Sequence, residues 1–185
     1  FLVNTHENHG KPLDAVDAET LGSAAAERVE RHLTFRENHK STPLHALGAL
    51  ASETGVGALH VKDEGHRFDL GSFKALGGAY AVSCLVLEEA SRQLGRTVDV
   101  SELQTPAVRE IAAKMTFACA TDGNHGRSVA QGAQMVGANS AIFVHGGVSD
   151  QRVAAIARFG AQIFRVEGTY DDSVAEAARV ADGNG

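Results

Sequence analysis

The fold is decided by residues 116–126, TFACATDGNHG, in which a short apolar run leads directly into a loop with two glycines. The run at 116–120 has the length and composition of a buried strand. The residues after the loop, 128–136, space their apolar side chains as a helix does. A strand that passes through a short loop into a helix is the repeating unit of a parallel α/β sheet.

The same alternation of strands and helices extends on both sides of this unit. Strands are predicted at 58–62, 141–144 and 162–166, and helices at 73–94, 107–114, 151–159 and 171–181. Short apolar strands between amphipathic helices predict an α/β fold, with a doubly wound, mostly parallel sheet and helices on both faces.

The first 40 residues differ from the rest because they are polar and rich in histidine. Apolar positions between 21 and 33 predict one helix there. We therefore expect an N-terminal arm with one helix at 1–40 and one α/β domain at 41–185. His6 and His9 could share a helix face, but no third ligand is near them in sequence, so no metal site is expected.

Composition limits the classes of function. The chain is 43% hydrophobic and carries 17 basic and 23 acidic residues, interspersed, for a net charge of -6. This charge disfavours nucleic acid and anionic membranes as partners, and no apolar run approaches the roughly 20 residues of a membrane span. We expect a cytoplasmic protein without a nucleic-acid or membrane partner, in which Cys84 and Cys119 are reduced core thiols.

The loop at 122–126, DGNHG, lies where an α/β sheet binds ligands, at the carboxyl end of a strand. Its glycines allow close approach of the backbone to a ligand, and Asn124 offers both a donor and an acceptor. The alternative is purely structural, because Asp122 and Asn124 could simply cap the following helix.

Lys74 is the second candidate, in the first turn of the predicted helix at 73–94. The positive end of the helix dipole and the apolar neighbours Phe73, Ala75 and Leu76 would favour the neutral amine that attacks an aldehyde. The alternative is an ordinary exposed lysine on a solvated helix face.

Together, the two segments resemble fold-type II pyridoxal-phosphate (PLP) enzymes, the tryptophan synthase beta-like group. Residues 72–74, SFK, followed by two glycines at 77–78, are similar to the segment that carries the Schiff-base lysine. The loop at 122–126 is similar to the Ser-x-Gly-Asn-His-Gly loop that contacts the cofactor ring. Two such motifs in this order are far more specific than either one alone.

Further details resemble diaminopropionate ammonia-lyases. These are the runs KDEGHRF at 62–68 and LGSFKALGGAYA at 70–81, and Thr121-Asp122 in place of the usual serine. The resemblance covers nearly the whole chain from about Ser41. Asp69 departs from it, because a glycine is expected at that position.

The resemblance implies a catalytic role for two residues. Lys74 would hold PLP as a Schiff base and then act as a base or acid at the substrate Cα, and Asp122 would remove the Cα proton, particularly from a D enantiomer. The implied reaction of this carbon-nitrogen lyase is the α,β-elimination of 2,3-diaminopropionate to pyruvate and ammonia.

The resemblance also implies the cofactor contacts. Asn124 would hydrogen-bond the phenolic oxygen of PLP, Phe73 would line the ring face, and Gly123 and His125 would contact the cofactor as parts of the loop. The substrate would be a small amino acid.

Members of this family are longer and carry a glycine-rich phosphate loop later in the chain. We therefore expect the N-terminal portion of such an enzyme, with a missing C-terminal half as partner, in a homodimer. Gly146 and Gly147 could form a phosphate cradle, but their position favours a strand-to-helix turn. The alternatives are a truncated or split, non-catalytic α/β subunit, and another fold-type II lyase similar to threonine or serine dehydratases. A dinucleotide-binding domain is disfavoured because no Gly-x-Gly-x-x-Gly follows a first strand.

Overall fold

The computed structural model describes residues 3–183 of the chain. It divides into two compact units, Phe1–Glu37 and Asn38–Gly185.

The first unit contains two helices where the sequence predicted one. They are α1 (Ala15–Leu21) and α2 (Ser23–Thr34), joined by Gly22 in an extended conformation. The carboxylate of Asp14 caps α1 by accepting a hydrogen bond from the backbone N–H of Asp17 at 2.8 Å. The prediction missed α1 because its residues have no buried apolar face, so they lack the periodic pattern on which the prediction relied.

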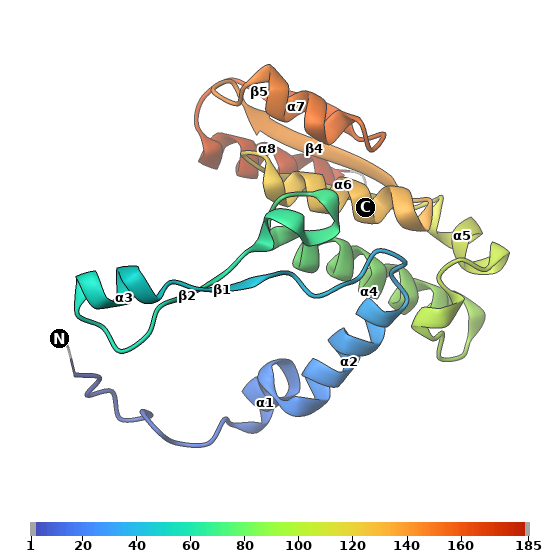
Figure 1. Cartoon of the computed structure of the whole chain (residues 1–185). Coiled ribbons are helices and arrows are strands. Elements are labelled where there is room, and N and C mark those ends of the chain that lie inside the picture. Colours follow the sequence, from blue (N-terminus) through green and yellow to red (C-terminus); the bar gives the residue numbers. More distant parts are fainter. Residues whose placement is uncertain (1–2, 184–185) are drawn as a thin grey trace. The chain divides into compact units, whose positions relative to one another are not determined.

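The second unit contains the sheet and the remaining helices (Figure 1). Its strands are β1 (Leu44–Ala46), β2 (His60–Lys62), β3 (Thr116–Ala120), β4 (Asn139–His145) and β5 (Gln162–Val166). Its α-helices are α3 (Gly48–Thr54), α4 (Lys74–Leu94), α5 (Pro106–Ala112), α6 (Asn124–Val136), α7 (Asp150–Ala157) and α8 (Tyr170–Gly183), and its 3-10 helices are η1 (Glu64–Asp69) and η2 (Val100–Glu102).

The main sheet is parallel, with the strand order β3-β4-β5. The predicted strand near residue 60 is not part of it, because β2 pairs antiparallel with β1 in a separate two-stranded sheet. The side chains of β4 alternate between two cores, as expected for a strand covered on both faces. Ile142 and Val144 share a core with residues of α6 and α7. Phe143 packs on the other face with Ala177 of α8, and its ring stacks on that of Phe164 with 4.8 Å between the ring centroids.

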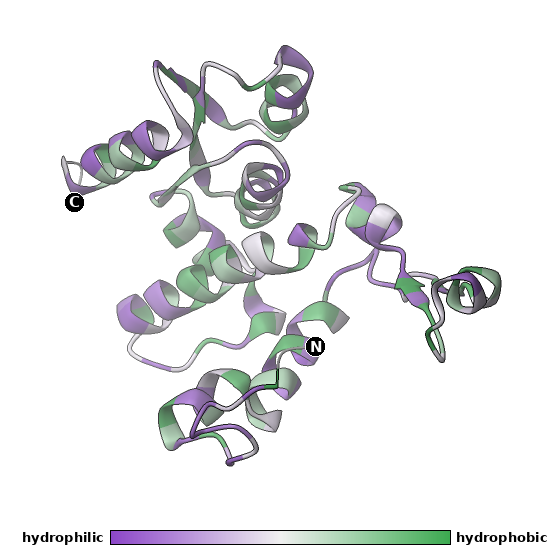
Figure 2. Cartoon of the chain, turned by 90° about the vertical axis from the view of Figure 1, so that its left-hand side faces the viewer, coloured by the Kyte–Doolittle hydropathy of each residue, from purple (hydrophilic) through white to green (hydrophobic). Residues whose placement is uncertain are grey.

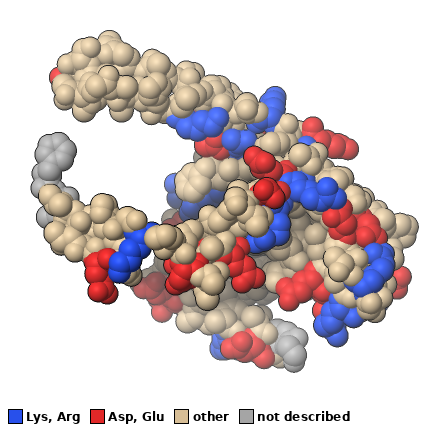
Figure 3. Space-filling view, turned by 90° about the horizontal axis from the view of Figure 1, so that it is seen from below, with Lys and Arg blue, Asp and Glu red and all other residues tan. Residues whose placement is uncertain are grey.

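The predicted fold class is therefore confirmed, with helices on both faces of a parallel sheet. Figure 2 shows that the helices around this sheet carry hydrophobic and hydrophilic residues together, as helices packed on one side only do. On the face in Figure 3, basic and acidic side chains are interspersed, so no large region of one charge appears there. No helix among residues 3–183 is long and apolar enough to span a membrane.

The two cysteines are free thiols, and both are partly buried. Burial raises the pKa of Cys119, on β3, to about 12, so this thiol is protonated at neutral pH.

The feature of the fold that positions the site is the close packing of α4 against α6. A Cβ added to Gly78 would lie 2.7 Å from the Oγ of Ser128, and one added to Gly132 would lie 2.7 Å from the Cα of Ala79. The backbone N–H of Ala79 donates a hydrogen bond to the Ser128 hydroxyl at 3.1 Å. These small residues let the two helix backbones approach closely, so both helices begin beside the same cavity.

Candidate active site

A cavity of about 540 Å³ lies at the carboxyl end of β3, where α4, α6, α7 and α8 begin. Its lining comes from these four helices and from the loop after β3. The lining residues are Lys74, Ala120, Thr121, Asp122, Gly123, Asn124, His125, Arg127, Gln151, Arg152, Ala155 and Tyr170. Five of the six residues that the sequence singled out, Lys74 and 122–125, therefore meet at one cavity, in the place where parallel α/β sheets bind ligands.

Phe73 is the exception. Its side chain is 64% exposed, and it lines a neighbouring apolar groove rather than the cavity itself. Lys74 and His125 line both, so the groove and the cavity are adjacent. The apolar surroundings expected for Lys74 are accordingly provided in part only, because Ala75 is buried while Phe73 and Lys74 are exposed.

The loop after β3 is held by Thr121, whose side chain is buried. Its hydroxyl oxygen accepts hydrogen bonds from the backbone N–H groups of Gly123 and Gly126, both at 3.0 Å. One buried oxygen thus fixes the loop and the first turn of α6. In the sequence, Thr121 stood out only as a replacement for serine, and no local pattern indicated this role.

The helix α6 begins at Asn124, one turn earlier than the predicted start at 128. Gly123 occupies the N-cap position with a φ of 152°, which favours glycine, and no side chain caps the helix there. The alternative in which Asp122 and Asn124 serve only as caps is therefore not what the structure shows. Because the first N–H groups of a helix have no partner within it, this end of α6 suits an anionic group.

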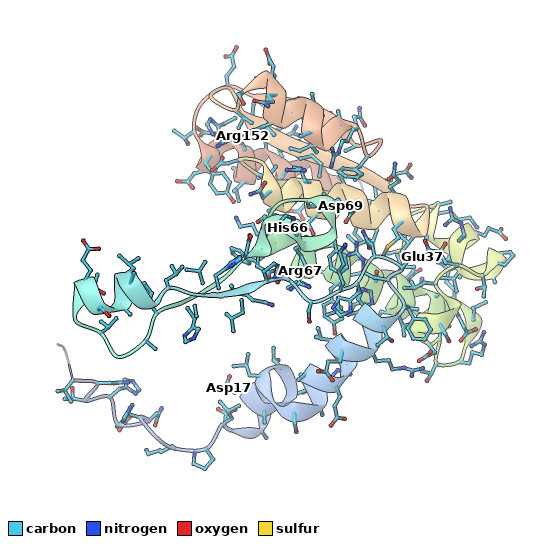
Figure 4. The ribbon with its side chains drawn as sticks, viewed as in Figure 1. Asp17, Glu37, His66, Arg67, Asp69 and Arg152 are labelled. Atoms are coloured by element: carbon cyan, nitrogen blue, oxygen red, sulfur yellow. The ribbon has the colours of Figure 1, made fainter. Side chains whose placement is uncertain are left out.

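The charges of the side chains around the cavity also suit an anion. The lining contains three basic side chains, those of Lys74, Arg127 and Arg152, and one carboxylate, that of Asp122. The Nε of Arg127 is buried without a hydrogen-bond partner in the described part of the chain. The pKa of the Arg127 guanidinium is lowered, mainly by burial and further by the positive charge of Arg158. Arg152, in the first turn of α7 (Figure 4), donates a long hydrogen bond of 3.5 Å to the carbonyl oxygen of Asp122.

The lysine and the loop interact electrostatically. The pKa of His125 is lowered, mainly by desolvation and further by the positive charge of Lys74. His125 is therefore neutral at neutral pH, and its ring can share the cavity with a cationic neighbour.

The carboxylate of Asp122 has a partner that the sequence did not indicate. The Nε2 of His145, at the end of β4, lies 3.2 Å from the Oδ1 of Asp122. The register of β3 against β4 brings the two side chains to the same sheet edge, and local sequence patterns do not encode that register. Arg152 gave no sequence signal either, since nothing in the sequence distinguishes it from other helix arginines.

The turn that leads into α4 contains Arg67 and Asp69, which are labelled in Figure 4, and it has an unusual backbone. Phe68 and Asp69 have φ angles of 49° and 59°, in the left-handed region. Asp69 is the position at which the sequence resemblance led us to expect glycine, and its positive φ gives the physical reason.

The same turn is anchored by an ion pair with little exposure to solvent. Arg67 Nε lies 2.7 Å from Glu64 Oε2, and the Thr42 hydroxyl donates a hydrogen bond of 2.6 Å to Glu64 Oε1. The hydrogen bond from Arg67 is the main cause that lowers the pKa of Glu64 to about 2. This cluster ties the segment before β1 to the turn that leads into α4.

Two further observations concern metal-binding groups and the glycine pair after β4. Residues 3–183 contain no group of three or more His, Cys, Asp or Glu side chains placed to hold a metal ion. Gly146 and Gly147 form the turn between β4 and α7 and are not among the residues that line the cavity.

Comparison with known proteins identifies relatives. The chain is 43% identical over 136 residues to the diaminopropionate ammonia-lyase of Escherichia coli K12, a match that covers 74% of this chain and 33% of that protein. A crystal structure of the Escherichia coli diaminopropionate ammonia-lyase in apo form superposes with a TM-score of 0.75 at 36% identity, over 88% of this chain and 43% of that one. The structure of the same enzyme in complex with D-serine superposes with a TM-score of 0.74 at 37% identity, over 85% of this chain and 40% of that one.

This chain thus spans about a third of the length of the curated relatives that it matches. Residues 35–185 match the family model described as pyridoxal-phosphate dependent enzyme. The predicted resemblance to diaminopropionate ammonia-lyases is confirmed, and the chain belongs to the family of pyridoxal-phosphate dependent enzymes of fold type II.

Proposed function

We propose that the protein containing this chain is a PLP-dependent carbon-nitrogen lyase that converts 2,3-diaminopropionate to pyruvate and ammonia. The observation that carries the proposal is the meeting of Lys74 with the loop at 122–125 on one cavity. The matched relatives named diaminopropionate ammonia-lyase support the choice of reaction.

The residues present fit the cofactor that the family indicates. In this proposal Lys74 holds PLP covalently, and Asn124 hydrogen-bonds its phenolic oxygen. The cationic lining suits an anionic ligand. When bound, PLP supplies an electron sink for the negative charge that forms at the substrate Cα. In this proposal Phe73 still lies beside the cofactor ring, because it lines the groove next to the cavity and is accessible there to a ligand.

The protein groups then handle protons and orientation. We assign proton removal from Cα to Asp122 for D substrates and to Lys74 for L substrates, since both side chains line the cavity. Gly123 and His125 shape the wall next to the ring. The D-serine complex of the Escherichia coli enzyme supports a site of this class that accepts a D amino acid.

That complex also favours a second candidate, a lyase that acts on a hydroxyamino acid in the manner of serine dehydratases. The two candidates differ only in the group lost from the β carbon, ammonia or water. They are separated by comparing D-serine with 2,3-diaminopropionate as substrates.

The experiment uses the complete natural protein that contains this sequence, supplied with PLP. We expect pyruvate and ammonia from 2,3-diaminopropionate, and loss of both products in Lys74→Ala. A wild-type protein that binds PLP but forms product faster from D-serine would favour the second candidate. A wild-type protein that forms pyruvate from neither substrate would contradict both.

We further propose that residues 41–185 form an α/β domain completed by another segment. Support comes from the apolar groove beside Phe73, where Phe73 and Leu85 remain 64% and 48% exposed, and from β3, which has no second neighbour among the described strands. Homodimer formation and a cytoplasmic location remain predictions, to be tested by analytical ultracentrifugation and by cell fractionation.

A further inference from the structure

We propose that His145 is a positioning residue for Asp122: the imidazole holds one carboxylate oxygen so that Asp122 is oriented to take the Cα proton of a D substrate. The proposal rests on the proposed function, because it deepens the role given there to Asp122. It goes beyond that role by naming the group that orients the base.

The position of the pair follows from the register of the sheet. Ala120 of β3 is paired with Phe143 of β4, and the backbone N–H of Thr121 donates a hydrogen bond to the carbonyl oxygen of Phe143 at 3.0 Å. Asp122 and His145 each lie two residues further along their own strand direction. They therefore emerge side by side at the carboxyl edge of the sheet, where His145 Nε2 lies 3.2 Å from Asp122 Oδ1.

The backbone fixes which nitrogen of His145 faces the carboxylate. The N–H of Gly147 donates a hydrogen bond to the Nδ1 of His145 at 3.1 Å. A backbone N–H can only donate, so Nδ1 must present a lone pair. The neutral ring then carries its proton on Nε2, which is the nitrogen that faces Asp122.

The two partners differ in exposure, and this indicates which one orients the other. The side chain of His145 is 25% exposed, whereas that of Asp122 is 61% exposed. An imidazole held by the backbone at one nitrogen can anchor a more mobile carboxylate at the other. Because one oxygen of Asp122 is engaged and the residue lines the cavity, its second oxygen is the one left for a ligand.

The chemical consequence is orientation without transfer. In the proton-removal step the Cα–H bond breaks, the proton goes to a carboxylate oxygen of Asp122, and the electron pair stays on the substrate. His145 neither gains nor loses a proton. Orienting a base in this way matters because a displacement of about 1 Å can cost on the order of 100-fold in rate.

The first measurement examines the pair in the full chain without cofactor. Long-range nitrogen–proton NMR on the histidine-labelled protein should show His145 as the Nε2–H tautomer, with an Nε2 proton that exchanges more quickly in Asp122→Ala. An Nδ1–H tautomer, or the same proton exchange in Asp122→Ala, would overturn the proposal.

The second measurement compares D- and L-2,3-diaminopropionate in the complete natural protein. His145→Phe keeps a planar ring but cannot donate, and we expect it to lower kcat for the D isomer about 10- to 100-fold with little change in KM or in L turnover. His145→Gln, whose amide can still accept at one end and donate at the other, should restore most of the D turnover. A merely structural role would lower the turnover of both isomers together, and that result would overturn the proposal.

The two measurements separate failure of this proposal from failure of the proposed function. If NMR finds the Nε2–H tautomer and the coupling to Asp122 but the wild-type enzyme turns over only the L isomer, the assignment of Asp122 as the base is wrong. If D turnover is present and His145→Phe leaves it unchanged, the orienting role of His145 is wrong while the proposed function stands.

Discussion

Gly78 on α4 and Ser128 on α6 touch so closely that a single added methyl group at residue 78 would lie 2.7 Å from the serine hydroxyl oxygen. Lys74 lies one helical turn before Gly78, and Asn124 lies one turn before Ser128. This contact therefore sets how near the lysine and the loop can be. Gly78, which the sequence offered only as part of a motif, therefore has a packing function.

The first prediction concerns this contact. Gly78→Ala should lower the free energy of unfolding by about 1–3 kcal/mol, because the added methyl group meets the Ser128 side chain and the backbone of Val129. Urea unfolding measures the change. Gly77→Ala is the matched control, since a Cβ there meets nothing within 4 Å, and replacing a glycine inside a helix should raise stability by about 0.5–1 kcal/mol. Equal effects at both positions would contradict the packing argument.

The second prediction concerns the buried hydroxyl of Thr121. Thr121→Val keeps the shape of the side chain but leaves the N–H groups of Gly123 and Gly126 without their acceptor. We therefore expect it to lower the free energy of unfolding by about 1–3 kcal/mol. Thr121→Ser retains the oxygen and should lose less than half as much. Thermal unfolding of the two variants provides the comparison, and a serine variant as unstable as the valine variant would argue against the hydrogen bonds.

The third prediction is a pH dependence that arises from Glu64. Its pKa in the folded chain is lowered to about 2 by the hydrogen bond from Arg67, below the ordinary value of 4.5. A carboxyl group with a lowered folded-state pKa stabilises the fold above its unfolded pKa, and this contribution is lost as the pH falls from about 4.5 toward 2. Glu64→Gln should therefore reduce the slope of stability against pH in this range.

Glu110→Gln is the control for this titration, because the Glu110 side chain is 77% exposed and its contact with Lys114 is a long one of 3.6 Å. It should keep the wild-type slope. Stability measured by urea unfolding at several pH values distinguishes the two variants, and an unchanged slope in Glu64→Gln would show that its ion pair does not favour the folded state.

The fourth prediction concerns the left-handed backbone at Asp69. A residue with a Cβ is strained by roughly 1–2 kcal/mol at such a φ, whereas glycine is not, although glycine loses more backbone entropy on folding. Asp69→Gly should therefore raise the free energy of unfolding by about 0.5–1 kcal/mol. Asp69→Ala keeps the Cβ and should not be stabilising. A glycine variant less stable than the alanine variant would contradict this assignment.

Much of this architecture could be predicted from sequence because periodicity reports burial directly. The strands at 116–120 and 162–166 occur as predicted, since each is a short apolar run between helices. The pairing of β1 with β2 could not be predicted, because three-residue strands with exposed side chains carry no alternation. The early start of α6 was missed because Asn124 and His125 are polar residues whose helical conformation depends on Thr121, a tertiary feature.

The candidate site shows the same division. The motif resemblance selected Lys74 and the loop, and the fold placed them on one cavity. It could not place the Phe73 side chain, which lies in the adjacent groove, nor the imidazole beside Asp122. Contacts between residues distant in sequence depend on strand register and helix packing, which local patterns do not encode.

In the proposed function, Lys74 is the residue that holds the cofactor. The most direct test is to incubate the complete natural protein with PLP, reduce it with borohydride and map the labelled peptides by mass. Lys74→Ala and Lys114→Ala serve as matched variants. We expect a yellow absorbance band that reduction bleaches and a phosphopyridoxyl group on Lys74, both lost in Lys74→Ala and both kept in Lys114→Ala. A label on another lysine, or undiminished labelling in Lys74→Ala, would contradict this role of Lys74.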